Sequence, residues 1–178
     1  MPKPSDPPPP QERFTVEPIG WVRSPYARRF GTPQQASAVG SNAEAILEFD
    51  ERRIFKESFL DLDGIDRIWV ISYLDRGGLW SSSVYPPRGP RKRRGLFATR
   101  SPDRPNPIGL SAVQLVRVDG CRLHVVGIDL LDGTPILDVK PYVPYADAFP
   151  DARAGWIDDI PRDAPQIPRY PPLADEGG

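Results

Sequence analysis

The chain has 178 residues with 39% hydrophobic content and a formal net charge of −1 at pH 7, which suits one ordinary domain with an apolar core. It has no apolar run near the ~20 residues that cross a bilayer and no charged-then-apolar leader, so we expect a cytoplasmic protein without membrane contact. A single cysteine, Cys121, excludes an internal disulfide, and a single histidine, His124, excludes a His/Cys metal cluster. We expect no metal, although carboxylates alone could still hold one.

The prolines gather at the two ends of the chain. Six of the 24 lie in residues 1–12 and five in residues 158–178. Proline-rich ends of this kind rarely bury enough apolar surface to fold on their own. We predict a disordered tail over 1–12, one folded domain over 13–157, and an extended proline-rich arm over 158–178 that lies on the domain or on a partner subunit.

The middle of the chain reads mostly as strands. Apolar and β-branched runs of strand length cover residues 14–22, 43–49, 67–74, 108–118 and 122–131. The last two runs are joined by Asp119-Gly120-Cys121, and Asp-Gly favours a tight hairpin. A short helix is predicted over 50–62, where Ile54, Phe55, Phe59 and Leu62 recur at helical spacing. The pattern predicts a mainly β fold, a small antiparallel β-barrel with one or two short helices and extended proline-rich termini.

Several common catalytic architectures are excluded. A doubly wound nucleotide-binding sheet needs alternating strands and helices with a glycine-rich first turn, and neither is present. There is also no Gly-Lys-Ser/Thr phosphate loop and no Gly-x-Ser-x-Gly elbow. Because the one histidine falls on a predicted strand, a Ser-His-Asp hydrolase is disfavoured.

The segment 97–111 contains a stiff loop. We call its residues 100–107 the proline turn. Ser101, Arg104 and Asn106 each precede a proline, which drives the preceding residue into extended geometry. The turn therefore presents side chains on a rigid frame. A plain proline-rich connector with solvated arginines is the structural alternative.

A basic segment precedes and includes part of this turn. Residues 88–104 carry seven basic side chains and one acid, Asp103, in a chain that is slightly acidic overall. Such a patch concentrates a polyanion or a phosphorylated ligand. The basic residues are Arg88, Arg91, Lys92, Arg93, Arg94, Arg100 and Arg104.

A second polar group follows the hairpin, over residues 129–142. We predict a turn at Asp132-Gly133-Thr134-Pro135, which brings Asp129 and Asp132 to its open end. Asp138 and Lys140 lie two residues apart on a predicted strand, so they face the same side. A structural ion pair and a functional pair are equally good interpretations of them.

These motifs together closely resemble the TsaA/TrmO-like family over about residues 16–156. The matching segments are Ile19-Gly20, Ser24-Pro25, 97–111, 129–135 and 138–142. The resemblance implies a small β-barrel that uses S-adenosylmethionine without a Rossmann domain, as a homodimer with the cofactor near the subunit interface. It also implies methylation of N6 of N6-threonylcarbamoyladenosine, next to the anticodon of a tRNA.

Carried onto this chain, the resemblance implies a set of site residues. It places the cofactor at Gln34, Gln35, Arg67, Arg93, Arg100, Asn106, Asp129, Leu131, Asp132 and Thr134. Tyr142 adds an aromatic face for a sulfonium, and Asp138 or Lys140 would be the base for a carbamoylated nitrogen, which is a poor nucleophile. Phosphates of tRNA would contact Arg88, Arg91, Lys92, Arg94 and Arg104.

The chain departs from the family pattern at two places in the cofactor pocket. Gln34 stands where the family commonly has arginine, and Arg67 stands where it commonly has histidine. Two other functions therefore stay open. One is S-adenosylmethionine-dependent methylation of a small metabolite, and the other is a non-catalytic S-adenosylmethionine-binding module.

Overall fold

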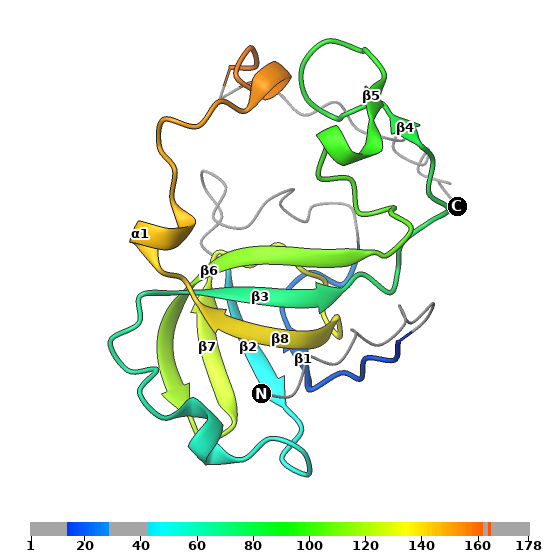
Figure 1. The fold of residues 1–178 in the computed structure, drawn as a ribbon. Coiled ribbons are helices and arrows are strands. Elements are labelled where there is room, and N and C mark those ends of the chain that lie inside the picture. The colour runs from blue at the N-terminus through cyan, green and yellow to red at the C-terminus, as the bar shows by residue number, and fades with distance from the viewer. Residues whose placement is uncertain (1–13, 29–42, 162–163, 165–178) are drawn as a thin grey trace, which may run out of the picture.

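Six antiparallel strands form a closed barrel in the order β1-β2-β7-β6-β3-β8 (Figure 1). The computed structural model describes residues 14–28, 43–161 and 164. The barrel strands are β1 (Gly20–Arg23), β2 (Glu44–Phe49), β3 (Arg67–Tyr73), β6 (Ile108–Asp119), β7 (Arg122–Val126) and β8 (Pro135–Pro141). The predicted antiparallel β-barrel is thereby confirmed.

The core fills the barrel because strand residues alternate between its inside and its outside. In β3, Ile68 and Val70 are fully buried, whereas their neighbours point outward. The other fully buried aliphatic side chains come from the remaining strands and from the segment after β7, namely Val22, Leu47, Val113, Leu123, Val125, Ile128 and Ile136. No helix among the described residues is long and apolar enough to span a membrane.

The predicted hairpin is confirmed. Strands β6 and β7 pair up to Asp119 and Arg122, which leaves Gly120 and Cys121 as a two-residue connection. Gly120 has a φ of +61°, which a glycine adopts without steric cost. The second strand is shorter than predicted, because β7 ends at Val126 and the next residue, Gly127, has a φ of +85°.

The predicted bounds of two other elements are wrong. The first strand begins at Gly20 rather than at residue 14, since the segment before it includes Pro18, which lacks the N–H that a ladder needs. The helix over 50–62 is only a 3₁₀ turn, η1 (Lys56–Phe59). Phe59 packs edge-on against Phe49 in the core, but Phe55 points to solvent, so the apolar positions do not share one buried face.

A tight contact at Gly20 closes β1 onto β2. A Cβ at this position would lie 2.5 Å from the backbone oxygen of Glu48 and 2.9 Å from Phe49 Cα. Backbone atoms paired in a closed barrel have little room to move. We expect Gly20→Ala to lower the free energy of unfolding by about 1–3 kcal/mol in urea titrations.

Gly95 is the matched control for this substitution. It also lies on a strand, but nothing stands within 4 Å of the position of its Cβ. Gly95→Ala should change the free energy of unfolding by less than ~0.5 kcal/mol. Equal losses in the two variants would contradict this account of β1 packing.

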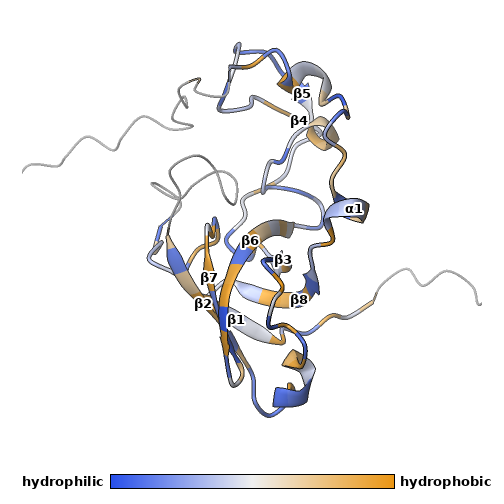
Figure 2. Ribbon diagram, turned by 90° about the vertical axis from the view of Figure 1, so that its left-hand side faces the viewer, coloured by the Kyte–Doolittle hydropathy of each residue, from blue (hydrophilic) through white to orange (hydrophobic). Residues whose placement is uncertain are grey.

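A small lobe stands apart from the barrel (Figures 1 and 2). It contains the two-stranded sheet of β4 (Ser83–Val84) and β5 (Arg94–Gly95) and the 3₁₀ turn η2 (Leu96–Ala98). A strap that includes η3 (Gly155–Ile157) holds it, because Trp156 Nε1 donates to the backbone oxygen of Ala98 at 2.9 Å. We call residues 79–99 with the strap 155–161 the basic lobe.

Candidate functional site

Three strand ends define one rim of the barrel. Tyr73 at the end of β3 pairs with Ile108 at the start of β6, and Ser72 pairs with Ile136 near the start of β8. The proline turn enters β6 and the segment 127–134, here called the acidic turn, enters β8. Strand pairing therefore brings these two segments to the same rim.

The acidic turn is held rigidly. Asp129 accepts a hydrogen bond of 2.6 Å from the hydroxyl of Ser111, and Asp132 accepts one of 3.2 Å from the backbone N–H of Ser24. Thr134 donates through Oγ1 to the backbone oxygen of Leu131 at 2.7 Å, and Gly133 between them has a φ of +75°. Both carboxylates are thus fixed at the rim, as the sequence predicts.

A buried carboxylate, that of Asp103, holds the proline turn in place. Asp103 is 8% exposed, and its carboxylate accepts a 2.7 Å hydrogen bond from the backbone N–H of Gly78. Arg104 donates to the backbone oxygen of Thr99 at 3.0 Å. Arg100 and Asn106 remain exposed on the turn.

Residues 74–78 connect the two turns. Arg76 donates a short hydrogen bond to the backbone oxygen of Asp132, in the acidic turn. In the same segment, Leu74 N–H donates to Pro107 and Gly78 N–H donates to Asp103, in the proline turn. Sequence reasoning missed Arg76 and the structural role of Asp103, although the Gly77-Gly78 pair beside Arg76 is a signal of close backbone approach.

The remaining candidates lie on the outer face of β3 and β8. Asp138 and Lys140 form the predicted ion pair at 2.8 Å, with side chains 44% and 61% exposed. Asp138 is thus half-buried, whereas Lys140 is exposed. A bulge where the register shifts after Ile71 turns both side chains outward and leaves Val139 against the core.

Tyr142 and Arg67 sit at the far end of this face. Tyr142 N–H donates to the backbone oxygen of Arg67, and its ring lies 5.4 Å from the ring of Trp69. The Trp69 indole N–H donates to Asp147 at 2.9 Å. The N–H of Val143, followed by that of Trp69, lowers the pKa of Asp147, so this carboxylate stays ionised.

Within one chain, the predicted site residues do not all lie close together. Arg67 is six residues from Tyr73 along β3, which at ~3.3 Å per residue is about 20 Å from the rim. Gln34 and Gln35 lie outside the described residues. Arg88, Arg91, Lys92, Arg93 and Arg94 lie on the basic lobe.

A separate cavity of about 610 Å³ opens on the side of the barrel formed by β2, β6 and β7. Its lining includes Ser24 and Asp132 at the rim and extends to Arg117 and His124. Among the predicted site residues that the structure describes, only Asp132 lines it. The size is within the usual range for a small ligand.

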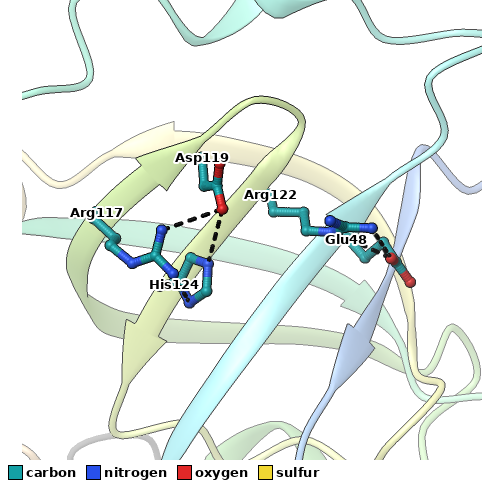
Figure 3. A network of polar contacts seen from close by, with 5 residues as sticks. All are labelled: Glu48, Arg117, Asp119, Arg122 and His124. Carbon is teal, nitrogen blue, oxygen red and sulfur yellow. Dashed lines mark hydrogen bonds and ion pairs between the residues drawn. The ribbon is translucent and has the colours of Figure 1, made fainter.

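Arg117 and His124, which line this cavity, belong to a polar network on the outside of the barrel. Figure 3 shows its side chains. Asp119 accepts from Arg117 at 3.2 Å and has His124 Nε2 at 3.9 Å, while Arg122 donates to Glu48 at 3.1 Å. Hydrogen bonds from Arg23 and then Arg122 lower the pKa of Glu48. Ion pairs this exposed contribute little to stability, so we interpret the network as a solvated surface over β1, β2, β6 and β7.

Comparisons with known proteins agree with one another. The family model of the tRNA-methyltransferase O N-terminal domain matches residues 21–148. A tRNA (adenine(37)-N6)-methyltransferase of Escherichia coli is 39% identical over 83% of this chain and 66% of its own length. A Pseudomonas aeruginosa protein whose name describes an S-adenosylmethionine-dependent methyltransferase is 42% identical, over 83% of this chain and 64% of its own.

A solved structure shows the same fold. The crystal structure of TrmO from Pseudomonas aeruginosa superposes with a TM-score of 0.70 at 39% identity, covering 84% of this chain and 65% of that one. The chain thus spans slightly less than two thirds of the length of these relatives.

Proposed function

The chain belongs to the tRNA-methyltransferase O family, and from this premise we propose that it methylates tRNA with S-adenosylmethionine as the methyl donor. The target is N6 of N6-threonylcarbamoyladenosine next to the anticodon, in the cytoplasm. The observation that carries the proposal is the joining of the proline turn and the acidic turn through Arg76 and Asp103 at one rim.

The described residues fit the proposed cofactor. Asp129 and Asp132 place two carboxylates at the acidic turn, where a sulfonium and an ammonium group would be favoured. Arg100 and Asn106 are exposed on the proline turn, where they suit a carboxylate and a purine edge. The cofactor supplies an electrophilic methyl group when bound, and the two turns exclude water and align the acceptor.

The acceptor needs a base, because the lone pair of a carbamoylated nitrogen is delocalised. Asp138 is the proposed base and accepts the N6 proton. Its second oxygen is held by Lys140 and its first by the backbone N–H of Val139 at 2.8 Å. Tyr142, stacked near Trp69, gives an aromatic wall to the same face.

A homodimer would explain why the cofactor residues at the rim and the residues on the outer face of β8 lie apart within one chain. The outer face of β3 and β6 exposes Tyr73, Ile108 and Leu110, and Leu110 pairs with Ile71 on the same face. An exposed apolar patch of this kind marks an interaction surface. A second copy packed on it in a twofold arrangement would bring the β8 face of one subunit toward the rim of the other.

Leu110→Glu tests this interface. Leu110 is 59% exposed in one chain, so the substitution should leave the monomer folded. An unpaired charge buried at the interface costs about 3 kcal/mol or more, which raises the dissociation constant of the dimer ~100-fold. Sedimentation should show a dimer for the unsubstituted protein and a monomer for Leu110→Glu.

Val116→Glu is the control for Leu110→Glu. Val116 lies on the same strand with similar exposure, six residues further along. It should leave the dimer intact. A monomeric unsubstituted protein, or dissociation by both variants, would contradict the proposed face.

Two measurements test the function itself. Calorimetry with S-adenosylmethionine tests the cofactor, and mass spectrometry of tRNA nucleosides from a deletion strain tests the substrate. Loss of the methylated threonylcarbamoyl nucleoside supports the proposal. Cofactor binding with an unchanged nucleoside profile would overturn it in favour of a small-metabolite methyltransferase or a non-catalytic binding module.

A further inference from the structure

Phe97 is an unexplained exposed aromatic residue. Its side chain is 81% exposed on η2, in the middle of the basic segment, although its neighbour Leu96 is buried. The backbone around it is fixed, since Thr99 donates through Oγ1 to the backbone oxygen of Leu96 at 2.8 Å and Trp156 donates to Ala98. The ring is therefore held outward by ordered structure.

An arginine already lies on this ring. The guanidinium carbon of Arg104 is 5.4 Å from the ring centroid of Phe97. Arg104 is itself held by its hydrogen bond to Thr99 and by the proline that follows it. With most of the ring still exposed, Phe97 keeps a flat surface free beside a fixed positive charge.

The same pairing of aromatic ring and arginine recurs across the basic lobe. Tyr85 has the guanidinium carbons of Arg91 and Arg93 at 5.5 and 5.7 Å from its ring centroid. Trp156 pairs with Arg94 at 4.7 Å, but its N–H is used by Ala98, so this ring has a structural role. The lobe thus presents rings and positive charges together.

Unpaired RNA has the matching chemistry. Bases in loops can leave the stack, and proteins bind them by stacking on aromatic rings or guanidinium planes while basic side chains hold the phosphates. A duplex keeps its bases stacked on each other and offers mainly phosphates. An acidic protein surface would satisfy the charges but would not need a flat exposed ring.

We infer that Phe97, backed by Arg104, is a stacking platform for an unpaired nucleobase of an RNA loop, with Tyr85 as a second ring on the same lobe. Arg91, Lys92 and Arg93 contact the phosphates on either side. The inference rests on the proposed function for the choice of RNA, and it does not depend on methyl transfer.

The test uses the full chain and two unmodified RNA probes. One is a hairpin whose loop carries unpaired adenines and 2-aminopurine, and the other is a blunt duplex with the same stem. Stacking of one base contributes ~1–3 kcal/mol, so Phe97→Ala should weaken hairpin binding by about 5- to 150-fold and abolish the quenching of 2-aminopurine. Duplex binding should stay unchanged, and Phe97→Trp should retain hairpin binding.

Phe14→Ala is the matched control. Phe14 is the same residue type with 79% exposure, and it belongs to the segment before β1 of the barrel, outside the basic lobe. It should not affect either probe. Unchanged hairpin binding by Phe97→Ala, an equal loss on hairpin and duplex, or a change of oligomeric state in Phe97→Ala would overturn the platform.

The two proposals fail in different ways. Hairpin binding that depends on Phe97, together with an unchanged nucleoside profile in the deletion strain, would sustain the platform and overturn the methyltransferase. Methylation with hairpin binding unaffected by Phe97→Ala would overturn the platform alone.

Discussion

Asp138→Asn is expected to abolish methyl transfer while leaving S-adenosylmethionine binding nearly intact. General base catalysis contributes ~10²–10⁴-fold to a rate, and asparagine keeps the shape of the side chain but cannot accept the proton. Asp138 lies on the outer face of β8 and does not line the rim, so its loss should not disturb the cofactor. Single-turnover methylation of tRNA and calorimetry with S-adenosylmethionine measure the two effects separately.

Lys140→Ala distinguishes catalysis from structure. Lys140→Ala and Asp138→Asn each remove the 2.8 Å ion pair between Lys140 and Asp138. This pair is partly exposed and contributes at most ~1 kcal/mol to stability. If Asp138 is the base, Lys140→Ala keeps most of the rate. The reverse result would assign the base to Lys140, and full activity of Asp138→Asn would remove Asp138 from the mechanism.

The second large effect is expected from Asp103→Ala. Asp103 is buried and accepts the N–H of Gly78, so its removal leaves a buried donor unsatisfied at a cost of about 1–3 kcal/mol. The larger consequence is a weaker frame, because the segment 74–78 then loses one of the hydrogen bonds that tie it to the proline turn and keeps the one from Leu74 to Pro107. We expect at least a tenfold weaker affinity for S-adenosylmethionine, or ~1.4 kcal/mol, with a lowered Tm.

Asp63→Ala is the control for Asp103→Ala. Asp63 is an exposed acid in the connection between β2 and β3. Its substitution by alanine changes the net charge by the same amount as Asp103→Ala and does not touch the rim. Its calorimetric and thermal profiles should match those of the unsubstituted protein. If Asp103→Ala binds the cofactor as tightly as Asp63→Ala, the hydrogen bond to Gly78 is not what shapes the site.

The fold could be predicted largely from local signals. The alternation in β2 and β3 and the Asp-Gly dipeptide at Gly120 fix two strands and one hairpin, and short connections favour a barrel. The start of β1 and the extent of η1 could not be predicted, because each depends on tertiary pairing. Phe55 and Phe59 have the same local pattern, yet only Phe59 meets Phe49.

The candidate site could be predicted only in part. Motif spacing identified the two turns and the pair of Asp138 and Lys140. The outward orientation of that pair follows from a bulge against β3, which the sequence of β8 alone does not reveal. Arg76 joins segments more than fifty residues apart, and such a contact has no local signature.

A crystal structure with S-adenosylmethionine bound tests the central claim most directly. The account predicts a ligand that contacts both the proline turn, at Arg100 or Asn106, and the acidic turn, at Asp129 or Asp132, within one subunit or across the dimer. A ligand that touches only one of these turns, or that lies in the side cavity against Arg117 and His124, would contradict it.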